Sequence, residues 1–170
     1  MNLADYIRTI PDFPEEGIIF RDITTLLKDG SAFHEMVDRI GAPIAGKEID
    51  LIIGPEARGY LFGAPLAYAM GKGFILARKP GKLPAETVRH EYDLEYGVDA
   101  LEVHLDAIQP GQKVVIVDDL LATGGTALAV AKLVEKMGGE VVAFSFAIEL
   151  LDLGGREKLR GYEVHTVLTY

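Results

Sequence analysis

Short, continuous apolar runs alternate with stretches of helical periodicity over residues 51–148. The apolar runs predict buried strands, which we expect at 51–53, 74–77, 113–117 and 141–148. The periodic stretches predict helices at 60–70 and 126–137, and each follows a turn rich in glycine. Apolar strands flanked by helices are typical of a mainly parallel, twisted central sheet covered on both faces, so the pattern predicts an α/β fold.

Other patterns flank and interrupt these units. Leu3, Tyr6, Ile7 and Ile10 fall on one helical face, which predicts a short N-terminal helix that ends at Pro11. We further expect a helix at 31–44 opened by a capping serine, an antiparallel arm of 88–92 and 98–105, and a last strand at 163–168.

Composition narrows the class of protein. The 170 residues are 49% hydrophobic and 25% charged and show no repeat or linker, so we expect a single domain over residues 1–170. No apolar run approaches the roughly 20 residues of a membrane span, and residues 1–13 lack the pattern of a signal peptide. The lack of cysteine excludes disulfides and thiolate metal sites and favours a cytoplasmic location.

The charge of the chain disfavours nucleic acid as a partner. The formal net charge is -9, whereas nucleic-acid binding depends on clustered lysine and arginine. A small phosphorylated ligand is compatible with this charge, since a few local cations and oriented backbone N–H groups can hold it. The four histidines have no metal-ligand spacing, so the sequence favours a small anionic ligand over a polyanion or a histidine-bound metal.

Two carboxylates, Asp118 and Asp119, directly follow the apolar run at 114–117. In open α/β sheets, ligands bind beyond the carboxyl ends of the strands, where these residues are expected. Carboxylates are poor neighbours for a bare phosphate but good acceptors for the hydroxyls of a sugar. A pair that merely caps the following turn is the alternative interpretation.

The turn after the two aspartates has the composition of a phosphate-binding loop. Gly124 and Gly125 allow the backbone to approach a ligand closely, and Thr123 and Thr126 offer hydroxyls. The first turn of the following helix presents unpaired N–H groups and the positive end of the helix dipole. Because no lysine follows the glycines, a Walker-type P-loop fits less well.

The string from 114 to 126 is similar to the fingerprint by which phosphoribosyltransferases hold phosphoribosyl pyrophosphate. Further stretches resemble the adenine phosphoribosyltransferase family: FP and GIIFRDI within 13–23, G and RGYLFG within 54–63, RKPGKLP at 78–84, Y and LEYG within 92–97, IEL at 148–150 and GREKL at 155–159. The resemblance covers nearly the whole chain. It departs from the family at 55–57 and offers no usable pattern at 85–90.

The resemblance implies a magnesium-dependent enzyme of purine salvage that joins adenine to phosphoribosyl pyrophosphate, giving AMP and pyrophosphate. It also implies the type I phosphoribosyltransferase fold, with a base-recognition hood at 1–30 and a mobile lid at 83–97, and usually a homodimer. Two alternatives stay open. One is a transferase for xanthine, hypoxanthine or orotate, and the other is a regulator that senses a phosphoribosyl nucleotide without catalysis.

The resemblance further assigns roles to individual residues. It implies that the ribose and its 5'-phosphate are bound by Asp118, Asp119, Ala122, Thr123, Gly124, Gly125 and Thr126. It implies that pyrophosphate is bound by Arg58, Arg78, Lys79 and Lys82. Adenine is expected to be bound by Ile19, Phe20, Arg21 and Leu120. The catalytic residues that it implies are Glu95, Tyr96 and Arg58. It also implies that Mg2+ has no direct protein ligand and is held through substrate and waters.

Two of these implications rest on the resemblance alone. An exposed glutamate in an acidic arm is usually only solvated, so nothing in the residue itself marks Glu95 as catalytic. The peptide bond between Glu56 and Ala57 aligns with a non-proline cis bond of the family, and we expect the same bond here.

Overall fold

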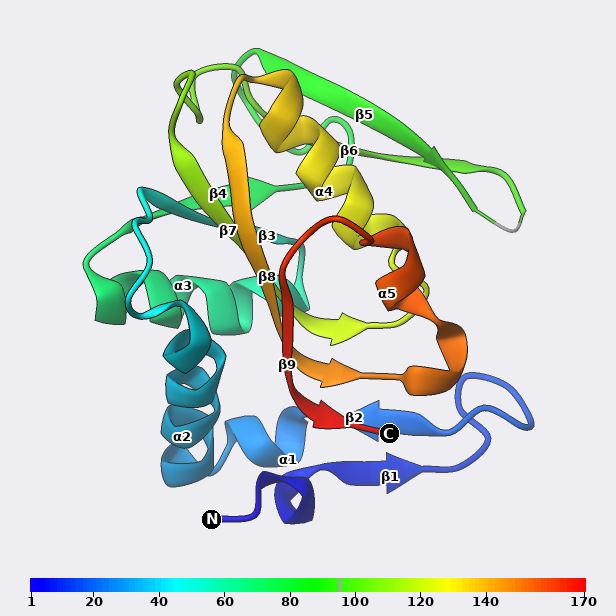
Figure 1. Cartoon of the computed structure of the whole chain (residues 1–170). Coiled ribbons are helices and arrows are strands. Elements are labelled where there is room, and N and C mark those ends of the chain that lie inside the picture. Colours follow the sequence, from blue (N-terminus) through cyan, green and yellow to red (C-terminus); the bar gives the residue numbers. More distant parts are fainter. Residues whose placement is uncertain (95) are drawn as a thin grey trace. The chain divides into compact units, whose positions relative to one another are not determined.

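The computed structural model describes residues 1–94 and 96–170, and the chain divides into two compact units, Met1–Arg39 and Ile40–Tyr170. The second unit contains a five-stranded sheet in the order β4-β3-β7-β8-β9, in which every neighbouring pair is parallel (Figure 1). Its strands are β3 (Leu51–Pro55), β4 (Gly73–Ala77), β7 (Lys113–Leu121), β8 (Glu140–Glu149) and β9 (Val164–Thr169). This sheet confirms the predicted α/β fold.

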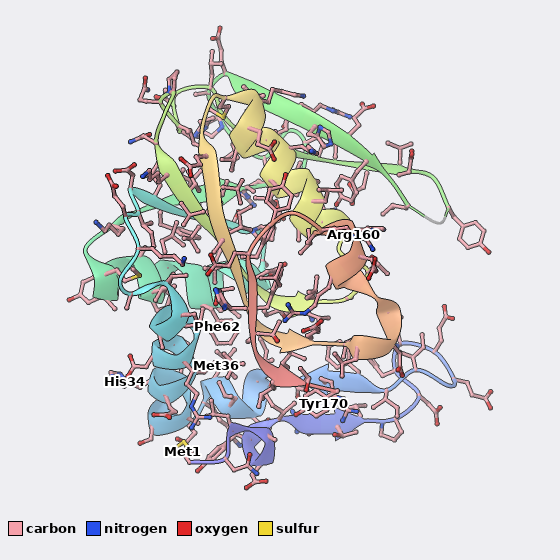
Figure 2. All side chains as sticks on the ribbon, viewed as in Figure 1. Met1, His34, Met36, Phe62, Arg160 and Tyr170 are labelled. Carbon is pink, nitrogen blue, oxygen red and sulfur yellow. The ribbon has the colours of Figure 1, made fainter. Side chains whose placement is uncertain are left out.

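Helices cover both faces of the sheet. On one face lies α4 (Gly125–Lys136), whose Val130 belongs to the same buried cluster as Phe144 of β8. On the other face lies α3 (Arg58–Met70), whose Phe62 is fully buried (Figures 1 and 2). The shorter helices of this unit are η2 (Ala42–Ile44), η3 (Leu151–Leu153) and α5 (Gly155–Lys158). No helix of the described residues is long and apolar enough to cross a membrane.

An antiparallel hairpin packs beside α4. It consists of β5 (Thr87–Asp93) and β6 (Val98–His104), and Figure 1 shows it running along that helix. Leu101 and Val103 of β6 are buried in the same cluster as α4, whereas β5 alternates half-buried and exposed residues. The hairpin confirms the antiparallel arm expected from the alternation of apolar and polar positions.

The central strand β7 extends beyond the point where its apolar run ends. The predicted strand ended at Val117, but the strand continues to Leu121. It does so because β8 still supplies backbone partners, and the register reaches Leu121↔Glu149. The two aspartates are therefore part of the strand and not of the turn that follows it.

The first unit begins with a one-turn 3-10 helix that is shorter than the predicted helix. Its elements are η1 (Leu3–Tyr6), β1 (Arg8–Ile10), β2 (Phe20–Asp22), α1 (Thr24–Leu27) and most of α2 (Gly30–Gly41). The prediction of a helix up to residue 10 is wrong because residues 8–10 pair with residues 20–22 as antiparallel strands. Backbone hydrogen bonds to β2 thus replace those that a longer helix would have formed.

The helix predicted at 31–44 is present as α2, but both of its ends differ from the prediction. Asp29, and not Ser31, accepts a hydrogen bond at the start, from the N–H of Ala32 at 2.9 Å. At the other end the chain changes to the 3-10 turn η2 at Pro43, which has no N–H with which to continue an α-helix.

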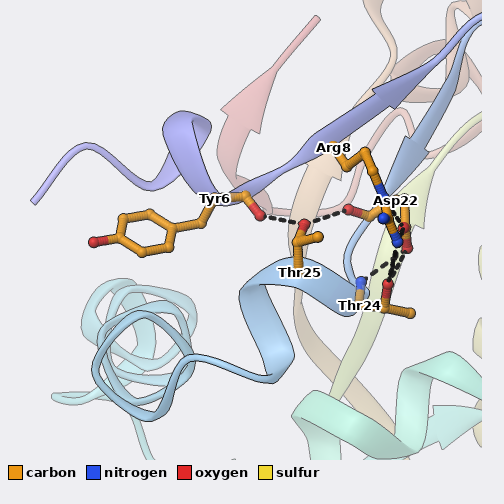
Figure 3. A network of polar contacts seen from close by, with 5 residues as sticks. All are labelled: Tyr6, Arg8, Asp22, Thr24 and Thr25. Carbon is orange, nitrogen blue, oxygen red and sulfur yellow. Dashed lines mark hydrogen bonds and ion pairs between the residues drawn. The ribbon is translucent and has the colours of Figure 1, made fainter.

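Asp22 is the centre of a polar network in the first unit (Figure 3). It is only 7% exposed, and its carboxylate accepts hydrogen bonds from Arg8 at 2.6 Å and from the Thr24 N–H at 2.9 Å. The hydroxyl of Thr25 donates to the carbonyl of Tyr6 at 2.6 Å. The Thr24 N–H and hydroxyl, with a further contribution from Arg8, lower the pKa of Asp22. The network fixes the end of β2 next to the residues expected to recognise a base.

Replacing Gly63 by alanine should destabilise the second unit. A β-carbon at Gly63 would lie 2.6 Å from Cε2 of Phe74, and the edge of that ring packs against Tyr60 with centroids 5.8 Å apart. Overpacking costs ~1–3 kcal/mol, which exceeds the ~1 kcal/mol gained by replacing glycine within a helix. Thermal unfolding should therefore show a midpoint lower by about 2–4 °C.

Gly30→Ala in α2 is the matched control, because no atom lies within 4 Å of a β-carbon placed there. Its unfolding midpoint should stay the same or rise. An equal midpoint for Gly63→Ala would show that the Phe74 ring moves aside without cost.

Candidate active site

The main cleft lies where the order of the strands reverses. The chain passes from β3 to β4 on one side and later from β7 to β8 on the other, and β3 and β7 are neighbours. Such switch points are where open α/β sheets bind ligands. The carboxyl ends of these two strands and the residues just after them, 55–58 and 118–127, line a cleft of about 370 Å³. The peptide bond between Glu56 and Ala57 in the first of them is cis, as expected.

Two adjacent carboxylates stand at the wall of this cleft. Asp119 is 6% exposed, and its Oδ2 lies 3.0 Å from Nε of Arg58, the first residue of α3. Oδ1 of Asp118 accepts the N–H of Asp119 at 2.8 Å. The surrounding protein keeps most water from Asp118 and so raises its pKa well above the usual range, and the neighbouring charge of Asp119 adds to this effect. Arg58 opposes it in part.

The predicted phosphate loop connects β7 to α4. Gly124 has a φ of +87°, a left-handed conformation that favours glycine, and α4 begins at the next residue. The N-cap residue of α4, Gly124, has no side chain to cap the helix, so the first N–H groups of α4 are available to an anion. Ala122, Thr123, Gly125 and Thr126 line the cleft with Gly124. The structure thus brings the whole predicted ribose-phosphate set together at one cleft.

Three of the four predicted pyrophosphate cations, Arg58, Arg78 and Lys79, are paired with carboxylates. Nε of Arg78 lies 3.3 Å from Oε1 of Glu56, and the same oxygen accepts the N–H of Lys79 at 2.6 Å. The ammonium of Lys79 bonds to Asp99 of the hairpin, which raises the pKa of Lys79 and lowers that of Asp99. Lys82 is exposed in the segment after β4. Of the four predicted cations, only Arg58 lines the cleft itself.

The residues predicted to recognise the base divide between the two units. Leu120 lines the cleft of the second unit. Ile19, Phe20 and Arg21 belong to the first unit, where the rings of Phe20 and Phe13 form a T-shaped pair with centroids 5.1 Å apart.

Of the two residues predicted for catalysis at the hairpin tip, the structure describes only Tyr96. Glu95 lies outside the described residues. Tyr96 is 88% exposed and is not one of the residues that line the cleft.

Three charged residues near the site were given no role by the sequence. Glu56 and Asp99 hold the predicted cations, and Lys158 lines a second cavity against the phosphate loop. Glu56 and Asp99 are each about 20 residues from their partners, so no local spacing reveals the pairs. The GREKL stretch marked Lys158 as part of the resemblance but gave it no chemistry.

Comparisons with known proteins agree with this geometry. The family model for the phosphoribosyl transferase domain matches residues 27–165. The adenine phosphoribosyltransferase of Clostridium perfringens is 61% identical over 170 residues, which is 100% of this chain and 99% of that protein.

Solved structures are similar as well. The crystal structure of adenine phosphoribosyltransferase from Thermoanaerobacter pseudethanolicus has 56% identity and a TM-score of 0.96, and the match covers 99% of this chain and 98% of that one. The Saccharomyces cerevisiae enzyme, crystallised with an iminoaltritol bisphosphate and adenine, has 40% identity and a TM-score of 0.91, with 96% and 95% covered.

Replacing Asp118 by asparagine should stabilise the protein in a pH-dependent way. The folded-state pKa of Asp118 lies above the value of about 3.9 of an unfolded chain. Between the two values the native state binds more protons, so ionisation of this group lowers stability as the pH rises. Asparagine keeps an oxygen for the Asp119 N–H and removes the charge.

Thermal unfolding should show a midpoint higher by about 2–4 °C at pH 8, with a gain that shrinks toward pH 4. Asp152→Asn, at an exposed position of η3, is the control and should show no such trend. A lower midpoint for Asp118→Asn at pH 8 would contradict the assignment of an unfavourable charge at Asp118.

Proposed function

This chain belongs to the adenine phosphoribosyltransferase family, and we propose how its residues transfer a phosphoribosyl group from phosphoribosyl pyrophosphate to adenine. The products are AMP and pyrophosphate. The observation that carries the proposal is the cleft at 118–127, where paired aspartates precede an uncapped helix start and face Arg58. We further propose that the enzyme acts in the cytoplasm as a homodimer, as is usual in the family.

The 5'-phosphate is bound by the loop at 122–126. Backbone N–H groups at the start of α4 and the hydroxyls of Thr123 and Thr126 donate to its oxygens. Hydrogen bonds to a charged group contribute ~1.5–3 kcal/mol each, so several of them outweigh the general acidity of the chain. Asp118 and Asp119 accept hydrogen bonds from the ribose hydroxyls, which is why carboxylates suit this wall of the cleft.

The pyrophosphate is bound by the cations around the cleft. Arg58 contributes from the cleft itself, and Arg78, Lys79 and Lys82 contribute from the segment after β4. Arginine offers a planar fork to phosphate oxygens and lysine a mobile charge. Because Glu56 and Asp99 now hold Arg78 and Lys79, the substrate takes the place of these carboxylates when it binds.

Enzymes of this family use Mg2+ together with phosphoribosyl pyrophosphate. The oxygen donors of this cleft suit a hard cation, since Asp118 and Asp119 place carboxylates beside the sugar site. These two residues would hold the ion through ribose hydroxyls and waters and not as direct ligands. When bound, Mg2+ neutralises charge on the pyrophosphate oxygens.

Adenine is recognised by shape and by its hydrogen-bonding edge. We assign stacking on the ring to Phe20, the edge to the backbone of Ile19 and Arg21, and contact with the ring face to Leu120, because these positions match the family motifs. A backbone carbonyl accepts from the 6-amino group of adenine. The same carbonyl opposes the 6-oxo group of hypoxanthine or guanine, which is also an acceptor.

The transfer breaks the bond from the anomeric carbon to pyrophosphate and forms the bond from that carbon to an imidazole nitrogen of adenine. The ribose carries positive charge in the transition state, which Asp118 and Asp119 stabilise from the cleft wall. Glu95 takes the proton that the adenine imidazole loses, and Tyr96 positions the base. The lid at 83–97 closes over the site and keeps water from the activated donor.

A substrate assay tests the proposed function. Pyrophosphate release from phosphoribosyl pyrophosphate should be fastest with adenine, and kcat/KM should fall at least about tenfold with hypoxanthine or guanine, because an unpaired buried polar group costs ~1–3 kcal/mol. Xanthine and orotate serve as further acceptors. Faster pyrophosphate release with any of these bases than with adenine would show that the enzyme prefers another base. Binding of AMP without pyrophosphate release with any base would indicate a regulator.

Replacing Glu95 by glutamine should lower kcat about 100-fold or more, since a glutamine cannot take the proton. The KM for phosphoribosyl pyrophosphate should change little, because the residue is assigned to the base and not to the donor. Glu91→Gln on β5 is the matched control, since this exposed glutamate pairs only with Arg89 among the described residues. Equal kcat values for the Glu95 variant and the wild type would remove Glu95 from the mechanism.

A further inference from the structure

The 5'-phosphate lacks a cationic partner among the residues assigned so far. The loop at 122–126 contains no basic side chain, and Arg58, Arg78, Lys79 and Lys82 are assigned to pyrophosphate. The phosphate brings about two negative charges at neutral pH into a cleft that already holds Asp118 and Asp119. A positive side chain on the far side of the loop would offset this repulsion.

A second cavity, of about 410 Å³, lies against the same loop. Thr123, Gly125 and Thr126 line both this cavity and the main cleft, so the loop forms a common wall. The rest of its lining is Tyr92, Asp93 and Leu94 of the hairpin side and Lys158 of α5. Among the described residues that line it, Lys158 is the one cation.

The ammonium of Lys158 lies next to the first residue of α4. A β-carbon placed on Gly125 would be 3.9 Å from Nζ of Lys158. The backbones of Gly124 and Gly155 are in direct contact, because a β-carbon on Gly124 would come within 2.7 Å of the Gly155 carbonyl oxygen. The long, flexible stem of a lysine then lets the ammonium reach a phosphate oxygen on the loop without movement of the backbone.

The segment that carries Lys158 is firmly anchored. Nε of Arg156 donates to both carboxylate oxygens of Glu149, at 2.8 and 3.0 Å, and its other nitrogens bond to Val164 and Thr166 of β9. Glu149 is only 4% exposed. α5 is therefore fixed to the end of β8 and to the first half of β9, which keeps Lys158 at the loop.

Lys158 differs from its charged neighbours in having no carboxylate partner among the residues that the structure describes. Arg156 pairs with Glu149, and Arg160 pairs with Glu157. Within 1–94 and 96–170, no ion pair or hydrogen bond engages the Lys158 ammonium. It can bind an anion without first releasing another one, unlike Lys79, which is held by Asp99.

We propose that Lys158 is a phosphate-binding residue, whose ammonium contacts the 5'-phosphate held by the loop at 122–126. The proposal rests on the proposed function, because it takes a sugar 5'-phosphate as the ligand of that loop. Lys158 neutralises this group while the cations around the main cleft neutralise pyrophosphate, so the two ends of the donor are bound by separate sets of charges.

Calorimetric titration of the Lys158→Gln variant tests this role. Its Kd for AMP and for ribose 5-phosphate should rise about tenfold or more, as expected for loss of a hydrogen bond to a charged group. Its Kd for adenosine and for pyrophosphate should match the wild type, since neither has a 5'-phosphate. Lys158→Arg, which keeps the charge, should restore much of the AMP affinity. The KM for phosphoribosyl pyrophosphate should rise in Lys158→Gln with kcat nearly unchanged.

Lys132→Gln is the matched control, because Lys132 is an exposed lysine of α4 that does not line the cavity. It removes the same charge and should leave all four Kd values unchanged. Equal AMP affinity in wild type and Lys158→Gln would overturn the proposal, as would an equal loss for AMP and adenosine, which indicates a structural role. If the wild type binds ribose 5-phosphate but makes no AMP from adenine, the proposed function fails while the test of Lys158 still stands.

Discussion

The ion pair between Arg58 and Asp119 is the contact on which the arrangement of the cleft depends. It joins the start of α3 to the end of β7, the two segments that meet at the switch point of the sheet. Without a cation there, adjacent carboxylates at the end of a buried strand would repel each other in surroundings that already disfavour the charge of Asp118. The pair thus stabilises a polar end on an otherwise apolar strand and holds Arg58 at the wall of the cleft.

The acidity of the whole chain and its affinity for a polyphosphate are compatible because charge is balanced locally. Glu56 holds both the Arg78 side chain and the Lys79 backbone, and Asp99 holds the Lys79 ammonium. Each pair keeps a cation oriented near the site. The free energy of ligand binding is therefore the gain from pairing these cations with the ligand less the loss of their pairs with the carboxylates. A ligand that takes Lys79 must displace Asp99 of β6, which links the proposed pyrophosphate subsite to a contact of the hairpin.

Periodicity predicted the parts of the fold that depend on burial, namely the parallel sheet, its two main helices and the antiparallel arm. It failed where backbone pairing decided the outcome, as at residues 8–10, which form a strand because β2 lies beside them. The end of β7 was misjudged for the same reason, since β8 extends the ladder past Val117. The motif at 114–126 located the cleft, but the partners of its cations are distant in sequence, so only the folded chain reveals Glu56 and Asp99.

The close approach of two glycines explains why the C-terminal segment can take part in the site at all. A β-carbon on Gly155 would lie 2.5 Å from the Ala122 carbonyl oxygen, and one on Gly124 would meet the Gly155 carbonyl in turn. Side chains at either position would push α5 away from the loop. The residues after Gly155 have different partners. Arg156 is bound to Glu149, and Leu159 is buried in the core. Lys158 is left facing the cavity beside the loop, where a structural role alone does not account for its charge.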